Sequence, residues 1–250
     1  MDAESFDPDT KGVDQTIIWR KGVATVGDCP QSRYYGNTNL EDNRRIVLRV
    51  IQVLLSQCLY YKPEEYLTIL NPFCVFFTCK RVPFAKNFFI SLLNTVIDYD
   101  THGSGIPYIS ASFKYDSDSL LIEQCLGILN VLIEYRPPTK DNVKFLIDGG
   151  FSSLKHIRDE LVRAHKPDGD DDSTPEEIET QVHEDLASNE FYRMLQVIHG
   201  KANLDPLRTG FVNILYNFIE ANNTYLPESV TVVDFYEEVL ILFWRFLHSN

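Results

Sequence analysis

The stretch FFISLLNTVIDYDTHGSGIPY, residues 88–108, decides the fold because it joins an apolar run to a helix-breaking loop. Seven of its first ten residues, FFISLLNTVI, are apolar, and none is glycine or proline, as in a buried helix. Asp98 and Asp100 follow, and a segment rich in glycine and proline ends the run. The pattern predicts a helix that begins near Pro83, a residue suited to a first helical turn, and ends near Tyr99.

Apolar helical runs separated by short breaks continue along the whole sequence. We expect further helices at residues 39–60, 63–70, 119–135, 141–147, 151–164, 184–199, 206–220 and 234–248, and a short apolar piece at 73–79. The alternation typical of strands is missing, which predicts an all-α fold. Two architectures fit, an armadillo/HEAT-like α-solenoid and an irregular stacked helical bundle, because the sequence shows no clean repeat.

The helix expected at 39–60 has a single polar strip, formed by Arg45, Arg49, Gln52 and Ser56. So narrow a strip predicts burial on more than one side. The helix at 234–248 also keeps apolar faces, with one line formed by Phe235, Val239, Leu242, Phe243 and Phe246. We therefore expect a further helical layer and interpret the sequence as a fragment of a longer protein.

Composition divides the chain into four segments: an irregular N-terminal arm (1–38), helical layers (39–165), an acidic flexible insert (166–183) and helical layers of the same domain (184–250). Residues 168–185 hold nine acidic side chains and no lysine or arginine, so most of the net charge of −13 is local. Nucleic-acid binding and direct binding to anionic membranes are disfavoured because both need a basic face. No apolar run approaches membrane-spanning length, and we expect neither a signal peptide in 1–10 nor myristoylation at Asp2.

The five cysteines lie mostly in apolar runs, which indicates buried free thiols in a reducing compartment. Cys74 and Cys79 have a CX4C spacing, but no second pair of cysteines or histidines lies nearby, so a zinc site is disfavoured. We expect no metal and no cofactor.

The loop after Tyr99 is the first candidate site. Asp98, Asp100, His102 and Ser104 resemble a cation loop, but the closing glutamate of a calcium site is missing. The favoured interpretation is a helix C-terminus with a left-handed glycine, and the alternative is a partner-docking loop. Both use the same residues, which are Asp98, Asp100, Gly103, Gly105, Pro107 and Tyr108.

The acidic insert is the second candidate site. It is interpreted first as a solvated linker and second as a segment that binds a basic partner or is phosphorylated. The residues concerned are Asp170, Asp171, Asp172, Ser173 and Thr174.

Three blocks of the chain resemble the high-temperature-induced dauer-formation family, a group of dymeclin-related Golgi trafficking proteins. They are NRRIVLRVIQVLLSQCLY (43–60), the NTVIDYDTHGSGIPY junction (94–108) with the helix that follows, and the pair YNFIEANNTYLPES (216–229) and FYEEVLILFW (235–244). The resemblance covers about residues 17–250 with the acidic insert unaligned. It implies a cytoplasmic protein, peripheral to Golgi membranes, that acts in the secretory pathway without enzyme activity.

The first functional hypothesis is therefore a non-enzymatic helical scaffold segment for vesicle trafficking, which binds other proteins. The second is a generic armadillo-like adaptor that binds an extended basic peptide, with Asn94, Asn130, Asn213 and Asn217 as candidates for the asparagine row of its concave face. The third is an enzyme with a cryptic site, although the sequence has no HEXXH, GXSXG or P-loop pattern.

Overall fold

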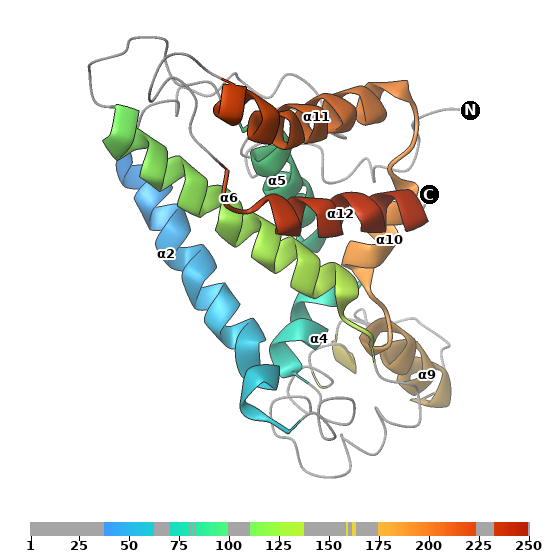
Figure 1. Cartoon of the computed structure of the whole chain (residues 1–250). Helices are drawn as coiled ribbons and strands as arrows, with labels where there is room; N and C mark the ends of the chain where they lie inside the picture. Colours follow the sequence, from blue (N-terminus) through green and yellow to red (C-terminus); the bar gives the residue numbers. More distant parts are fainter. Residues whose placement is uncertain are drawn as a thin grey trace. The chain divides into compact units, whose positions relative to one another are not determined.

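The computed structural model describes residues 38–62, 71–80, 82, 84–99, 111–137, 159, 162–163, 175–223 and 233–249. All regular structure in these ranges is helical, which confirms the prediction of an all-α fold (Figure 1). The principal elements are α2 (Thr38–Leu55), η2 (Ser56–Tyr60), α4 (Pro72–Thr78), α5 (Ala85–Ile97), α6 (Ala111–Glu134), α9 (Pro175–Leu186), α10 (Glu190–Val197), α11 (Lys201–Asn223) and α12 (Tyr236–Ser249).

The chain divides into two compact units. Unit 1 comprises Met1–Gln52, Lys86–Asn130 and Met194–Asn250, and unit 2 comprises Val53–Ala85 and Val131–Arg193. The borders between the units fall inside or beside helices, and they do not follow the composition boundaries at 165 and 184.

The central helix of unit 1 is α5, which contains the apolar run FFISLLNTVI at residues 88–97. Phe89, Leu92 and Val96 are completely buried, as expected for a helix packed on several sides. Its uncharged polar side chains are buried as well, and the Thr95 hydroxyl donates a hydrogen bond to the Ser91 carbonyl at 2.7 Å. Polar side chains are tolerated in a protein core when their hydrogen-bonding groups have partners.

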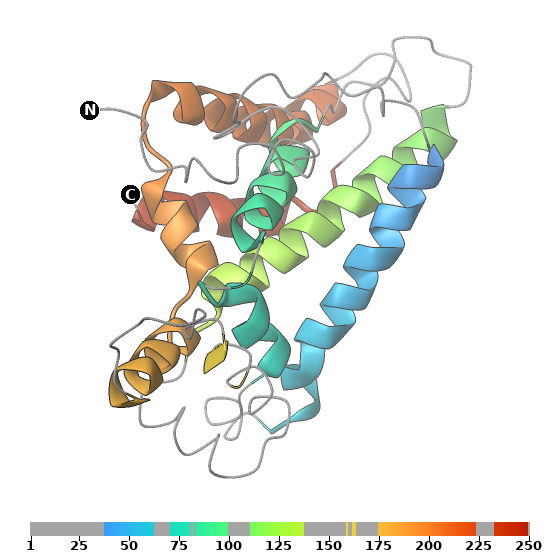
Figure 2. The same ribbon diagram turned by 180° about the vertical axis from the view of Figure 1, so that it is seen from behind.

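The helices α11 and α12 run antiparallel and side by side in unit 1, with α5 on one face of the pair (Figures 1 and 2). Phe211 of α11 and Phe243 of α12 stack with ring centroids 5.2 Å apart. At Gly210, α11 also approaches the backbone of Ile97 so closely that no side chain would fit. A glycine at this position therefore allows α11 to pack on α5.

The helix α2 lies along α6 in both views (Figures 1 and 2). Gln52 donates from Nε2 to the Gln124 carbonyl at 3.4 Å, beside Gly127 of α6. Gln52 therefore points toward α6, although it belongs to the polar strip that the sequence predicted to face solvent.

The prediction that α2 is buried on more than one side is wrong. The line that faces inward contains Leu48 and Leu55, which are buried, together with Glu41. Four apolar side chains of α2 are instead more than half exposed: Ile46, Val47, Val50 and Val53. Apolar content alone could not show which side faces the core, because the apolar residues nearly encircle the helix.

Unit 2 has its own apolar core around α4 and α9. Val75 and Cys79 of the α4 region pack with Ile178, Val182 and Leu186 of α9. The α9 residues are spaced by four, so they form one stripe along the helix.

The prediction of a flexible insert through residue 183 is therefore wrong from Pro175 onward. Pro175 occupies the first position of α9, where proline is well tolerated, and Glu176 and Glu177 suit the positive end of the helix dipole. Three buried aliphatic side chains then outweigh the acidic composition that suggested a linker. Residues 168–174 lie outside the described ranges.

Two asparagines connect helix ends in unit 2. Asn71 accepts hydrogen bonds from the backbone N–H groups of Phe73 and Cys74 at the start of α4, and it donates to the carbonyls of Leu54 and Leu55 at the end of α2. Asn189 does the same at α10, where it accepts from Tyr192 N–H and donates to the carbonyls of Leu132 and Tyr135. Each side chain satisfies groups that helix ends leave without partners.

Several helix limits differ from the predicted ones. The helix α6 begins at Ala111, eight residues before the predicted start at Ser119, and α11 begins at Lys201 and continues through Pro206. A single helix was predicted at 184–199, but Asn189 separates α9 from α10 by capping the second helix. The helices predicted at 63–70 and 141–147 lie outside the described residues, as does most of 151–164.

Candidate functional site

The loop after α5 is described only at its start. Asp98 is exposed, and its backbone N–H donates to the Asn94 carbonyl at 3.0 Å, in a last turn of helix. Tyr99 is buried, and its ring meets the Phe235 ring at a centroid distance of 5.7 Å. The contact with Phe235 therefore fixes the position of Tyr99, the residue that follows the last turn of α5. The other predicted residues of this loop lie outside the described ranges: Asp100, His102, Gly103, Ser104, Gly105, Pro107 and Tyr108.

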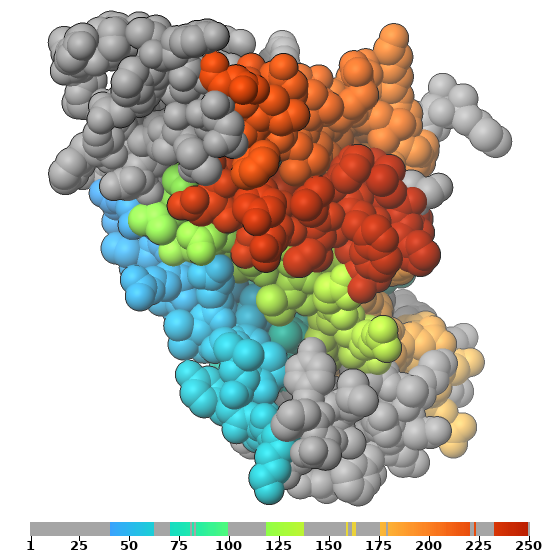
Figure 3. Space-filling view, in the orientation of Figure 1, coloured from blue at the N-terminus to red at the C-terminus, as the bar shows by residue number. Residues whose placement is uncertain are grey.

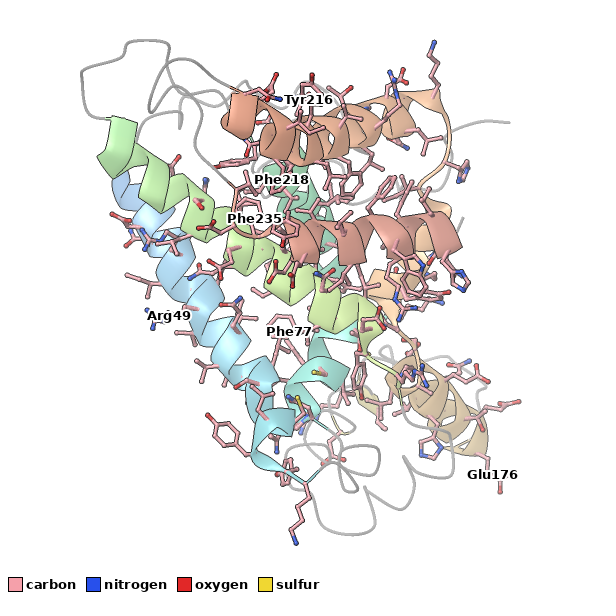
Figure 4. All side chains as sticks on the ribbon, viewed as in Figure 1. Arg49, Phe77, Glu176, Tyr216, Phe218 and Phe235 are labelled. Atoms are coloured by element: carbon pink, nitrogen blue, oxygen red, sulfur yellow. The ribbon has the colours of Figure 1, made fainter. Side chains whose placement is uncertain are left out.

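The acidic candidate segment also lies outside the described ranges: Asp170, Asp171, Asp172, Ser173 and Thr174. The described chain resumes at Pro175, and Glu176 and Glu177 in the first turn of α9 are exposed. Glu176 extends from the end of this helix (Figure 4). Acidic side chains thus face solvent where α9 begins. The role of residues 170–174 in binding a basic partner or in phosphorylation stays a prediction.

The four cysteines of the described residues are free thiols, with Cys74, Cys79 and Cys125 buried and Cys58 partly exposed. Burial, with a smaller contribution from neighbouring Cys58, raises the pKa of Cys74 to about 12. Burial also raises the pKa of the Tyr135 hydroxyl. Desolvation favours the neutral form of each group, so neither resembles an activated nucleophile.

Metal-ligating groups do not converge within the part of the chain that the structure describes. There, no three histidine, cysteine, aspartate or glutamate side chains lie close enough to hold an ion. Within the same residues, no helix combines the length and the apolar character of a bilayer span.

Three of the four asparagines proposed for an adaptor groove serve the fold instead. Asn94 is completely buried in α5, and Asn217 accepts a hydrogen bond from Val233 N–H at 3.1 Å. Asn130 donates from Nδ2 to the Glu238 carbonyl at 3.0 Å, which connects α6 to α12. Only Asn213 of this set is exposed, so the four do not form a row available to a peptide.

The outer side of α11 carries a stripe of exposed side chains. Val212, Tyr216 and Ile219 are each at least half exposed and follow one another at spacings of four and three residues. Tyr216 points away from α12, whereas Phe218 lies on the side that faces α12 (Figure 4). The Phe218 ring lies 6.0 Å from that of Tyr236.

A second stripe follows α12. Phe235, Val239 and Leu242 are buried, which confirms part of the packing line predicted from the sequence. The exposed stripe, which we call the α12 outer face, comprises Leu240, Ile241, Trp244 and Leu247. The space-filling view shows α12 uncovered along the face turned toward the reader (Figure 3). The sequence did not predict this face, because an apolar pattern alone does not distinguish the exposed side of α12 from the packed side.

The model of the family described as High-temperature-induced dauer-formation protein, Hid1, matches residues 6–250 of the chain. The chain belongs to the Hid1 family. This match confirms the resemblance seen in the three sequence blocks.

Two curated relatives in the Hid1 family are similar to the chain over almost its whole length. Protein HID1 of Mus musculus and Protein HID1 of Homo sapiens are each 28% identical to it over 233 residues, which cover 93% of the chain and 25% of the relative. The chain thus spans about a quarter of the length of these relatives. No solved structure gives a significant match.

Proposed function

We propose that this Hid1-family chain is a non-enzymatic helical scaffold segment that binds other proteins in Golgi and secretory-vesicle trafficking. Membership of the Hid1 family over residues 6–250 carries the proposal. The place of action, cytoplasmic and peripheral to Golgi membranes, follows from the family resemblance read in the sequence.

The surface of the described residues supports a binding role rather than a purely structural one. Exposed apolar side chains occur singly on most proteins, but contiguous stripes are typical of interaction sites. The stripe of Val212, Tyr216 and Ile219 extends over two turns of α11 and includes an aromatic residue with a polar tip. Tyrosine is enriched at the energetic centres of protein interfaces.

Two buried side chains, Cys74 and Tyr135, lack the pKa of an activated nucleophile, which is compatible with a non-enzymatic role. Active sites shift pKa values toward the working pH, whereas the pKa values of Cys74 and Tyr135 are raised away from it. The adaptor alternative loses its main support because Asn94, Asn130 and Asn217 are used inside the fold.

Affinity purification of the tagged chain from cells tests the proposal. Tyr216→Glu places a charge in the α11 stripe, and Asn213→Glu places the same charge on an exposed polar position of the same helix. We expect Golgi and vesicle-coat proteins to be enriched by the original chain and by Asn213→Glu, and to be lost with Tyr216→Glu. Equal recovery of Golgi proteins with both variants would show that the α11 stripe does not bind them. Absence of Golgi proteins from every sample would overturn the proposal.

A further inference from the structure

The α12 outer face stands apart from the side of α12 that packs in unit 1. Leu240, Ile241, Trp244 and Leu247 occupy positions i, i+1, i+4 and i+7, which lie on one side of a helix. Each is between 45% and 60% exposed, while Val239 and Leu242 on the opposite side are buried. A helix with two apolar sides is typical of one that packs on two partners.

Polar side chains that can pair with one another flank this apolar face along the helix. Glu237 is exposed at the N-terminal end, two turns before Trp244 and therefore on the same side. His248 lies at the other end, one turn after Trp244, and the Arg245 guanidinium lies over the Trp244 ring. The face thus has an acidic end, an apolar middle and a basic end.

The aromatic centre of the face is held in place before any partner binds. The Trp244 ring stacks on the His248 ring at a centroid distance of 5.2 Å and an interplanar angle of 6°. The guanidinium carbon of Arg245 lies 4.6 Å from the centroid of the same ring. A tryptophan restrained in this way loses little conformational entropy on binding, and tryptophan and arginine dominate interface hot spots.

We propose that the α12 outer face binds the α12 outer face of a second copy of this chain, as an antiparallel helix pair related by a twofold axis. In such an interface, if residue i of one copy contacts residue j of the other, j also contacts i. An axis that passes between Ile241 and Trp244 places Glu237 of each copy opposite His248 of the other. The apolar middle of one helix then covers the apolar middle of the second.

Complementary polar ends select a second copy as the occupant, because the Glu237 carboxylate of one copy can accept a hydrogen bond from the His248 imidazole of the other. The twofold arrangement pairs the acidic end of each helix with the basic end of the other, so a Glu237–His248 pair forms at both ends of the interface. A parallel arrangement would bring Glu237 beside Glu237, where like charges repel. The face is therefore complementary to itself in the antiparallel orientation.

The dimer is expected to be weak. The 14 residues of α12 are about 21 Å long at 1.5 Å per residue, so one helix pair buries less than the roughly 1,200 Å² of a standard interface. We expect a Kd on the order of 100 μM, with rapid exchange between monomer and dimer. This self-association is independent of the proposed place of action at the Golgi.

Sedimentation velocity of the whole chain, from about 5 to 500 μM, is the first test. The weight-average sedimentation coefficient should rise with concentration and should stay at the monomer value for Trp244→Glu. Asn213→Glu is the matched control, because it introduces the same charge at an exposed polar residue of α11. Leu247→Lys, at a residue 60% exposed, repeats the test if circular dichroism shows that Trp244→Glu is unfolded.

A charge exchange tests the antiparallel register. Glu237→Lys and His248→Glu should each weaken self-association, because each replaces an attractive pair with a repulsive or neutral one. An equimolar mixture should associate about threefold more tightly than either variant alone, because the lysine introduced in one variant then faces the glutamate introduced in the other.

A chain that stays monomeric throughout this concentration range overturns the proposal. Self-association that Trp244→Glu and Leu247→Lys leave unchanged also overturns it. The same holds if Asn213→Glu weakens self-association as much as Trp244→Glu does, or if the equimolar mixture associates no more tightly than either variant alone.

Discussion

Two asparagines of unit 2 each connect the ends of two helices. Asn71 and Asn189 each cap the start of one helix and bind two carbonyls at the end of another. The amide is suited to this role because one side chain supplies both an acceptor and two donors. The sequence revealed Asn71-Pro72 as a break but not as a connection, since the carbonyls that it binds lie 16 and 17 residues away.

Replacement of Asn71 separates its two functions. Asn71→Ala should lower the free energy of unfolding by about 2 to 4 kcal/mol, because it removes the cap and leaves buried carbonyls without donors. Asn71→Ser should cost about half as much, since the hydroxyl can still cap α4 but cannot reach the carbonyls. Urea unfolding measures both, with Asn213→Ala, on the surface of α11, as a control expected near zero. Equal losses for Ala and Ser would contradict the connecting role.

The raised pKa of Cys74 predicts how stability depends on pH. Burial raises its pKa to about 12 in the folded chain from 9.0 in the unfolded chain, so the unfolded chain releases this proton first. The stability that Cys74 contributes is therefore complete below pH 9 and is lost as the pH rises toward 12. Tyr135, whose pKa is also raised, acts in the same direction.

Denaturant unfolding between about pH 8 and 11 checks this, with Cys74→Ala as the comparison. The unfolding free energy of the original chain should fall more steeply above pH 9 than that of Cys74→Ala. Alkylation by iodoacetamide at about pH 8 should also modify Cys58 at least about tenfold faster than Cys74. Parallel pH curves together with rapid modification of Cys74 would show that this thiol is not buried.

At the scale of elements, close approach between helices depends on where the glycines lie. Gly210 of α11 and Gly127 of α6 are both helical glycines, but their surroundings differ. A Cβ at Gly210 would lie 2.4 Å from the Ile97 carbonyl oxygen, whereas a Cβ at Gly127 would meet only the end of the Gln52 side chain at 2.8 Å. The backbone of α5 cannot move aside as a glutamine side chain can.

The two glycines therefore predict opposite effects of alanine. Gly210→Ala should destabilise unit 1 by about 3 kcal/mol through overpacking against α5. Gly127→Ala should be neutral or stabilise by up to about 1 kcal/mol, because alanine favours the helix and Gln52 can change rotamer. Thermal melts of both variants measure the difference, and similar melting temperatures would mean that α11 does not pack on α5 at Gly210.

The helix α9 shows how composition can mislead a prediction. Its acidic and polar residues indicated a linker, yet Ile178, Val182 and Leu186 recur every four residues and are buried. That period was visible in the sequence, but the predicted end of the insert at residue 183 fell before Leu186 and so split the pattern.

Val182→Ala tests whether α9 belongs to the core of unit 2. The loss of two buried methyl groups should cost about 2 kcal/mol, while Gln181→Ala, on the exposed side of α9, should change little. Hydrogen exchange of the α9 amides should accelerate in the first variant only. If both variants behave like the original chain, residues 175–186 do not pack as described.

For the whole molecule, the sequence predicted the all-α class and the family correctly, because both depend on local patterns. Helical periodicity marked α2, α5, α6, α11 and α12, and the blocks at 43–60, 94–108, 216–229 and 235–244 marked the family. It could not predict the division into two units or the inward line of α2, because these depend on contacts between distant residues. The exposed stripe of α11 was missed for the same reason.

The Golgi scaffold is the central claim, and colocalisation in living cells tests it most directly. The tagged chain, its Tyr216→Glu variant and its Asn213→Glu control should be imaged beside a Golgi marker, with expression levels matched. The account predicts that the original chain and Asn213→Glu overlap with the marker, and that Tyr216→Glu is dispersed through the cytoplasm. A chain that is uniformly dispersed, or a Tyr216→Glu variant that stays at the Golgi, would contradict the claim that the exposed face of α11 binds Golgi proteins.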